Sequence, residues 1–380
     1  MKFKIPQHIQ TLQPYIAGKP IDELRREKKL DRIVKLASNE NPLGSSPKGL
    51  AAAIRSLSIT SRYVDPGGYS LIQALSKFYN KPADQIIAGA GTDSLISYMV
   101  KALTEETDEI LTAESTFIGI YVSTRKHNRN LKTIKLKDYG FDLEKIADSI
   151  TPKTRLIFLA NANNPTGTIF TKTQFEQFMT RVPSDVFVVL DEAYFNYSSH
   201  LPDYPNGLEY NYDNLIVTRT MSKDYGLAGL RIGFAFAHPE IIHQLYKVKL
   251  PFEPSLPAQW AGVAALEDAE FVTKTLELNR RMLLLMSDRF AKLGIRQVPS
   301  ASNFILLLMP SEEFAFAFNN ACLDHGLIVR HVKSFGIPNG IRINTGTEDE
   351  TAFALDIVES VFTKLFKLMP EAVLFAGAKG

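Results

Sequence analysis

The sequence predicts an α/β protein in which a large domain, built on a mainly parallel mixed sheet, is joined to a smaller α+β domain. Three observations predict it. The middle of the chain alternates short apolar runs with segments of helical period, which is the pattern of parallel strands covered by helices. From about Leu256 this pattern gives way to a long helical stretch followed by isolated apolar runs. The 380 residues, 45% of them hydrophobic, are enough to bury a large core.

Seven apolar runs in the middle of the chain are short enough to be buried strands, and the segments between them have helical period. The expected strands are Gln85–Ala88, Glu109–Thr112, Thr133–Leu136, Leu156–Ala160, Phe187–Leu190, Leu215–Thr218 and Ile232–Ala235. The expected helices include Thr92–Leu103, Phe117–Lys126 and Thr173–Thr180.

Three parts of the chain follow from these patterns. Residues 1–40 are rich in proline and charge and are expected to form an N-terminal arm and part of the small domain. Residues 41–255 carry the alternating pattern and form the large domain. Residues 256–380 form the small C-terminal domain.

Composition excludes several classes of function. Lys and Arg (43) nearly balance Asp and Glu (41) without a long block of either sign, so nucleic-acid binding is not expected. The single cysteine, Cys322, cannot form an internal disulfide, and the seven histidines lack metal-binding spacing. There is no secretory leader or apolar run long enough to span a bilayer, so a cytoplasmic location and no metal are predicted.

Polar loops follow four of the expected strands. They read "GAGTDS", "NANNPTG", "DEAY" and "TMSK" in chain order. In open α/β sheets ligands bind outside the carboxyl ends of the strands, so these loops are expected to face one crevice.

The loop after the sixth strand contains Lys223, which is followed by Gly226, Gly229 and Gly233. A lysine at the end of a strand, in a glycine-lined pocket, can be desolvated and become nucleophilic as a free amine. A solvated surface cation is the alternative. Asp191 ends a strand that looks fully buried, and a buried carboxylate needs a partner. The equal alternative is that Asp191 is the N-cap of a following helix.

An anion site is expected at "AGAGTDSL", where a strand meets a helix and free backbone N–H groups are available. Gly91, Thr92 and Asp93 would form it together with Ser222 and Arg231. The stretch lacks the full GxGxxG fingerprint, so nicotinamide binding is not implied.

Together these loops offer an amine nucleophile (Lys223), a carboxylate (Asp191), hydrogen-bond donors (Asn164 and Tyr194) and an anion cradle. Pyridoxal 5'-phosphate needs such a set: a lysine for its aldehyde, a carboxylate for its ring nitrogen, and N–H groups with an arginine for its phosphate. Each motif is weak alone, but their order along the chain makes this cofactor the prediction.

The chain resembles the fold-type I, aspartate aminotransferase-like pyridoxal-phosphate enzymes, and more narrowly the histidinol-phosphate aminotransferases. The resemblance covers nearly the whole chain. Its most specific pieces are "KLASNENPLGSSP", "RYVDPGGY", "NANNPTGT", "DEAY", "TMSKDYGLAGLRIGF" and "GIRINTGT".

The resemblance implies a role for each matching residue in holding the cofactor. Lys223 would bond covalently to its aldehyde, Asp191 would meet its ring nitrogen, and Asn164 and Tyr194 would bind its phenolic oxygen. Phe117 would stack on the ring. The equal alternative is that it is a buried residue of a core helix. Ser222, Arg231 and the backbone of Thr92 and Asp93 would bind the phosphate.

Further residues are implied for the substrate and for a second subunit. Tyr63 would reach the cofactor phosphate of the neighbouring subunit, which implies a homodimer. Arg342 would hold the acidic group of the substrate, and Arg330 is associated with substrate phosphate. Surface cations are the alternative for both, although Arg342 lies in an alternating apolar run next to a glycine, which favours a function. Tyr15 and Asn39 are weaker candidates for the substrate lid.

The resemblance implies transfer of an amino group between L-histidinol phosphate and 2-oxoglutarate, in L-histidine biosynthesis. An aromatic amino acid aminotransferase is the nearest alternative, because imidazole and phenyl are similar flat groups. A pyridoxal-phosphate decarboxylase of a phosphorylated amino acid and a non-catalytic fold relative also remain open.

Overall fold

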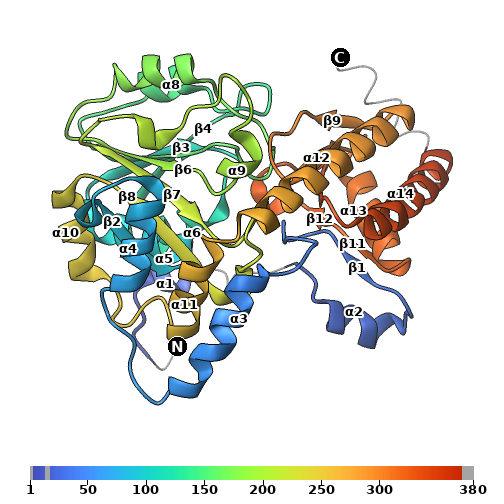
Figure 1. Cartoon of the computed structure of the whole chain (residues 1–380). Helices are drawn as coiled ribbons and strands as arrows, with labels where there is room; N and C mark the ends of the chain where they lie inside the picture. The colour runs from blue at the N-terminus through green and yellow to red at the C-terminus, as the bar shows by residue number, and fades with distance from the viewer. Residues whose placement is uncertain (1–2, 13–17, 370–380) are drawn as a thin grey trace.

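The computed structural model describes residues 3–12 and 18–369 and divides into two lobes joined by the long helix α12 (Figure 1). The larger lobe is built on a seven-stranded sheet in the order β2-β8-β7-β6-β5-β3-β4. The strand β8 runs opposite to the other six and is antiparallel to both of its neighbours, β2 and β7, so the sheet is mixed but mainly parallel, as predicted. Its strands are β2 (Ile86–Ala90), β3 (Glu109–Ala113), β4 (Asn130–Ile134), β5 (Thr154–Ala160), β6 (Phe187–Asp191), β7 (Leu215–Thr220) and β8 (Ile232–Phe236).

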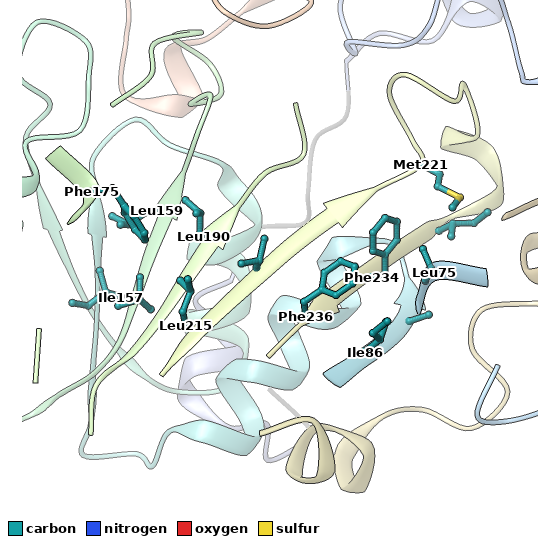
Figure 2. Close-up of a cluster of buried hydrophobic side chains, with 14 of the residues drawn as sticks. Leu75, Ile86, Ile157, Leu159, Phe175, Leu190, Leu215, Met221, Phe234 and Phe236 are labelled. Atoms are coloured by element: carbon teal, nitrogen blue, oxygen red, sulfur yellow. The ribbon is translucent and has the colours of Figure 1, made fainter. Parts of the chain in front are cut away.

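Helices cover both faces of this sheet because its central strands are apolar on both sides. One face packs against α5 (Thr92–Leu103), α6 (Ile118–Lys126) and α10 (Pro239–Val248). The other face packs against α4 (Tyr69–Tyr79), α7 (Leu143–Asp148), α8 (Lys172–Met179) and α11 (Leu256–Ala265). Figure 2 shows part of the second core, in which Phe234 and Phe236 of β8 lie beside Leu75 of α4.

The expected elements of this lobe are present, with differences at their ends. The predicted helix Thr92–Leu103 has the observed bounds of α5, whereas β4 lies at Asn130–Ile134 rather than at Thr133–Leu136. This strand is at the edge of the sheet and none of its residues is fully buried, so no run of apolar residues marks its bounds. The strand predicted to end at Thr218 continues to Thr220 as β7.

The smaller lobe has a four-stranded antiparallel sheet in the order β12-β13-β10-β9, and helices pack against it. A short parallel pair, β1 with β11, ties the N-terminal segment to this lobe. The strands are β1 (Val34–Lys35), β9 (Arg296–Val298), β10 (Phe304–Leu308), β11 (Leu327–Ile328), β12 (Arg330–His331) and β13 (Gly340–Asn344). The helices are α12 (Ala269–Lys292), α13 (Glu312–Asp324) and α14 (Glu348–Leu368).

The segment between the lobes belongs with the larger core. The helix α11 packs along α3 (Pro47–Ser56), and its residues Ala258 and Ala261 are buried in the core of the seven-stranded sheet. We therefore propose that the small domain begins near α12 rather than at residue 256. The remaining α-helices of the described residues are α1 (Gln7–Gln10), α2 (Ile21–Lys28) and α9 (Phe195–Ser198). None of the helices within residues 3–12 and 18–369 is both long and apolar enough to cross a membrane.

Candidate functional site

A cavity of about 250 Å³ opens where the strands β5, β6 and β7 end. The parallel strands bring their carboxyl ends to one edge, so the polar loops that follow them meet there. Nine of the residues predicted for the site line this cavity. They are Thr92, Asp93, Phe117, Asn164, Asp191, Tyr194, Ser222, Lys223 and Arg231.

Lys223 lies three residues beyond the end of β7, in a tight loop. Burial lowers the pKa of its amine to about 8, and the positive charge of Arg342 acts in the same direction. The ammonium form is therefore only weakly favoured near neutral pH. At pH 7 about a tenth of the amine is neutral and nucleophilic, far more than in a solvated lysine.

Close backbone packing holds the Lys223 loop in place. Gly226 has a φ of +65°, and a Cβ there would lie 1.9 Å from the carbonyl oxygen of Gly44. Asn41 donates from Nδ2 to the carbonyl oxygen of Asp224, at 2.9 Å. Glycine is required at 226 both for its conformation and for this approach, which fixes the loop against the "SNENPLG" segment.

Asp191 ends β6 and is almost completely buried. Its Oδ1 accepts hydrogen bonds from Thr218 Oγ1 and from the Ala193 N–H, both at 3.1 Å. Burial nevertheless raises the pKa of this carboxyl to about 7, against the effect of these bonds. A positively charged N–H placed in the cavity beside Oδ2 would stabilise the carboxylate, and the protonated ring nitrogen of pyridoxal phosphate is such a group.

Two hydrogen-bond donors are oriented toward the cavity by residues behind them. Arg342 donates from Nη1 to Asn164 Oδ1, so the amide of Asn164 retains its Nδ2 hydrogens for a ligand. Tyr194 accepts a bond from Asn39 Nδ2 at 2.8 Å, which leaves the phenolic hydrogen to donate. A pair of donors like this suits an anionic oxygen such as the phenolate of the cofactor.

The residues predicted to form an anion site meet at the N-terminus of α5, which begins at Thr92. The preceding Gly91 has a φ of +79°, and a Cβ on the facing Gly233 would come within 2.4 Å of the Thr92 nitrogen. Arg231 Nη2 lies 3.2 Å from Asp93 Oδ2, and the two side chains are 46% and 57% exposed. An ion pair this exposed is weak, so the guanidinium can also bind a phosphate at the helix terminus.

Phe117 forms a flat apolar wall of the cavity just before α6. A Cβ at position 119 would lie 2.4 Å from Phe117 Cε1. Gly119 is therefore what allows the phenyl ring to lie where it does.

The other predicted residues lie outside this cavity lining. Tyr63 is 84% exposed and stacks on Phe252, with ring centroids 4.4 Å apart. Arg342 is buried behind Asn164, and Arg330 pairs with it across β12 and β13. Asn39 lies behind Tyr194 as described above, and Tyr15 falls outside the described residues.

Sequence reasoning missed several residues at the cavity. Ser38, Glu40 and Thr220 line it, and Thr218 supports Asp191 from the neighbouring strand. Ser38 and Glu40 belong to the quoted "SNENPLG" stretch, so the motif was a signal for them. Thr218 carries no such signal, because its role depends on the pairing of β6 with β7.

Known proteins resemble this chain over nearly its full length. The family model for aminotransferase class I and II matches residues 31–358. Histidinol-phosphate aminotransferase 2 of Hydrogenovibrio crunogenus is 40% identical over 94% of this chain and 95% of its own length. Histidinol-phosphate aminotransferase 1 of Cupriavidus pinatubonensis is also 40% identical, over 93% and 95%.

Solved structures agree with this match. Histidinol-phosphate aminotransferase from Sinorhizobium meliloti, in complex with pyridoxal-5'-phosphate, superposes with a TM-score of 0.88 at 26% identity, over 95% of this chain and 98% of that one. Aspartate aminotransferase from Thermus thermophilus with maleate shares the fold, with a TM-score of 0.82 at 19% identity over 94% and 100%.

The match to the family model spans most of the chain, and the cavity holds the set of side chains that the family's cofactor requires. The chain therefore belongs to the class I and II aminotransferases, and pyridoxal phosphate is the cofactor that its residues fit.

Proposed function

We propose that this aminotransferase moves the amino group of L-histidinol phosphate to 2-oxoglutarate, giving imidazole acetol phosphate and glutamate, in L-histidine biosynthesis. The observation that carries the proposal is Arg342, which is only 5% exposed and whose guanidinium reaches the cavity residue Asn164. The names of the 40%-identical relatives support the choice of amino donor.

A planar guanidinium can pair with either a phosphate or a carboxylate. Arg342 is held by its Nη2 bond to the Ala37 carbonyl at 2.7 Å and lies 5.3 Å from the centre of the Phe304 ring. Arg330 adds a second positive charge on the neighbouring strand. One site can thus accept the phosphate of the amino donor and the distal carboxylate of 2-oxoglutarate in turn, as a ping-pong mechanism requires.

When bound, pyridoxal phosphate supplies an aldehyde that combines with amines and a ring that accepts electrons released at the substrate Cα. With its lowered pKa, Lys223 Nζ would serve as the general base for the proton on that Cα. Asp191 would stabilise positive charge at the ring nitrogen, and Tyr194 and Asn164 would donate to the oxygen on the ring. Phe117 would cover one face of the ring and exclude water from it.

The wild-type enzyme loaded with cofactor provides the test. Its visible absorbance is followed during titration with L-histidinol phosphate and, separately, with L-phenylalanine, without a keto acid. The proposal expects the band to disappear at much lower concentrations of L-histidinol phosphate. A preference for phenylalanine would reassign the enzyme to aromatic amino acids.

A homodimer is part of the proposal, with Tyr63 of each subunit completing the other subunit's phosphate site. In support, α3 and α11 lie side by side and expose large apolar side chains, among them Ile54 (60% exposed) and Trp260. Ile54→Asp should produce monomers in light scattering, whereas Phe316→Asp, at an exposed position on α13, should not. Mixing inactive Tyr63→Ala and Lys223→Ala subunits should restore activity in heterodimers, and failure of this rescue would exclude the shared site.

The proposed location is the cytoplasm. The sole cysteine, Cys322, is buried in the small domain, so the fold needs no oxidising compartment. Fractionation of cells that produce the enzyme would test this assignment.

A further inference from the structure

One carboxylate at the cavity has no part in holding the cofactor. Asp191 is the carboxylate proposed to meet the ring nitrogen and Asp93 is paired with Arg231, but Glu40 has neither role. It lines the same cavity as Lys223, and its charge acts on that amine. The remaining charged groups that act most strongly on Lys223 are Arg342, Arg231 and Asp93.

The backbone that carries Glu40 is fixed from three directions. Asn39 has a φ of +54° and donates from its N–H to Asn344 Oδ1 at 3.1 Å. Its carbonyl oxygen accepts from Asn303 Nδ2 at 3.2 Å, and its own Nδ2 bonds to the Tyr194 hydroxyl. The asparagine is thus buried, and its neighbours on both sides, Ser38 and Glu40, are presented to the cavity.

The side chain of Glu40 is also held. Lys35 Nζ lies 3.0 Å from Glu40 Oε2 and 3.1 Å from Oε1. The Lys35 side chain is 19% exposed and that of Glu40 is 48% exposed, so the lysine contacts the carboxylate on one side and leaves its other side open. A carboxylate has about four acceptor positions, and this contact leaves several for a ligand.

We propose that Glu40 is a specificity-determining residue that selects an amino donor whose ring carries an N–H group, an imidazole, over one with a phenyl ring. This inference rests on the proposed function and names the chemistry by which the same site distinguishes its substrate. An imidazole offers an N–H donor and becomes a cation near pH 6.5, and both forms bind favourably to a carboxylate. A phenyl ring offers neither, and the distal carboxylate of 2-oxoglutarate is repelled.

The test uses two ligands that differ only in their ring, L-histidinol phosphate and L-phenylalaninol phosphate. Their dissociation constants are measured on the cofactor-loaded enzyme by calorimetry and by visible absorbance. Glu40→Gln should raise the dissociation constant of L-histidinol phosphate about tenfold. It should change the dissociation constant of L-phenylalaninol phosphate less than about twofold. Its KM for 2-oxoglutarate should fall.

Two further variants separate recognition from a structural effect. Glu40→Asp keeps the charge and should retain part of the preference for imidazole. Glu270→Gln removes an exposed, ion-paired carboxylate on α12 and should leave the dissociation constants of both ligands unchanged. The pH midpoint of the visible absorbance, which follows the proton on the Lys223 nitrogen, should fall in Glu40→Gln because a nearby negative charge is lost.

The results distinguish this inference from the proposed function. One outcome is that the wild-type enzyme binds L-histidinol phosphate tightly while Glu40→Gln weakens the binding of both ligands equally, or of neither. In that case the proposed role of Glu40 is wrong and the proposed function stands. If the wild-type enzyme prefers L-histidine to L-phenylalanine, binds L-histidinol phosphate poorly, and loses the preference in Glu40→Gln, the function is wrong while the role of Glu40 stands. A wild-type enzyme that does not distinguish imidazole from phenyl overturns both.

Discussion

Replacing Asp191 by asparagine should stabilise the cofactor-free enzyme while abolishing tight cofactor binding. The carboxyl is buried and its pKa is raised from 3.8 to about 7, so the native state resists ionisation that the unfolded chain undergoes freely. The wild-type protein therefore loses stability as the pH rises from the unfolded pKa through the native one. The pKa shift lowers the free energy of unfolding by about 4 kcal/mol at high pH. About 2.5 kcal/mol of this loss occurs between pH 5 and pH 8.

Asparagine has the same shape and can accept the same bonds from Thr218 and the Ala193 N–H through its Oδ1. The free energy of unfolding in urea is measured at pH 5 and pH 8 for both proteins without cofactor. The stability difference between Asp191→Asn and the wild type should increase by about 2.5 kcal/mol over this interval. Asp288→Asn, at an exposed residue paired with Lys292, should show no such increase.

Adding the cofactor should remove the loss of stability that the wild type shows between pH 5 and pH 8. A protonated ring nitrogen stabilises the Asp191 carboxylate in the folded state. A stability difference that stays constant between pH 5 and pH 8 would refute the claim that burial controls the ionisation of Asp191.

Three other substitutions test separate parts of the site. Lys223→Ala should give a protein without the visible absorbance of bound cofactor, and a spectrum like the wild type would exclude Lys223 as the covalent attachment. Arg342→Ala should weaken the binding of both the amino donor and 2-oxoglutarate by roughly 2–5 kcal/mol, which is measured as a higher KM for each. A higher KM for only one substrate would refute the shared anion site. Gly119→Ala should displace the Phe117 ring and weaken cofactor binding about tenfold in a spectroscopic titration. Gly229→Ala, where a Cβ meets nothing within 4 Å, is the matched control, and equal affinities in the two variants would contradict the packing argument.

The fold could be predicted largely from the sequence because buried parallel strands are continuous apolar runs. The prediction fails where polar residues take part in a strand. Arg219 lies inside β7, where it is buried in a pair with Glu192 and stacks 3.5 Å over the Phe195 ring. Nothing in the local pattern indicates that this arginine has a buried partner 27 positions away.

The candidate site divides in a similar way. Residues that directly follow strands, such as Lys223 and Asp191, could be located because the topology brings strand ends together. Asn39 could be selected only by resemblance, and its bond to Tyr194 joins segments 155 positions apart. Contacts of this kind depend on how the two lobes pack, which sequence periodicity does not contain.

The contacts of residues 37–39 have a consequence for the order in which the protein matures during synthesis. Asn39 bonds to Asn344, and Ala37 to Arg342, each across 305 positions of the chain. On the ribosome the seven-stranded sheet, complete by Phe236, can fold before β13 has been made. Residues 37–39 can form these contacts only after β13 emerges, so a nascent chain holds a finished sheet and an incomplete site until translation is nearly complete.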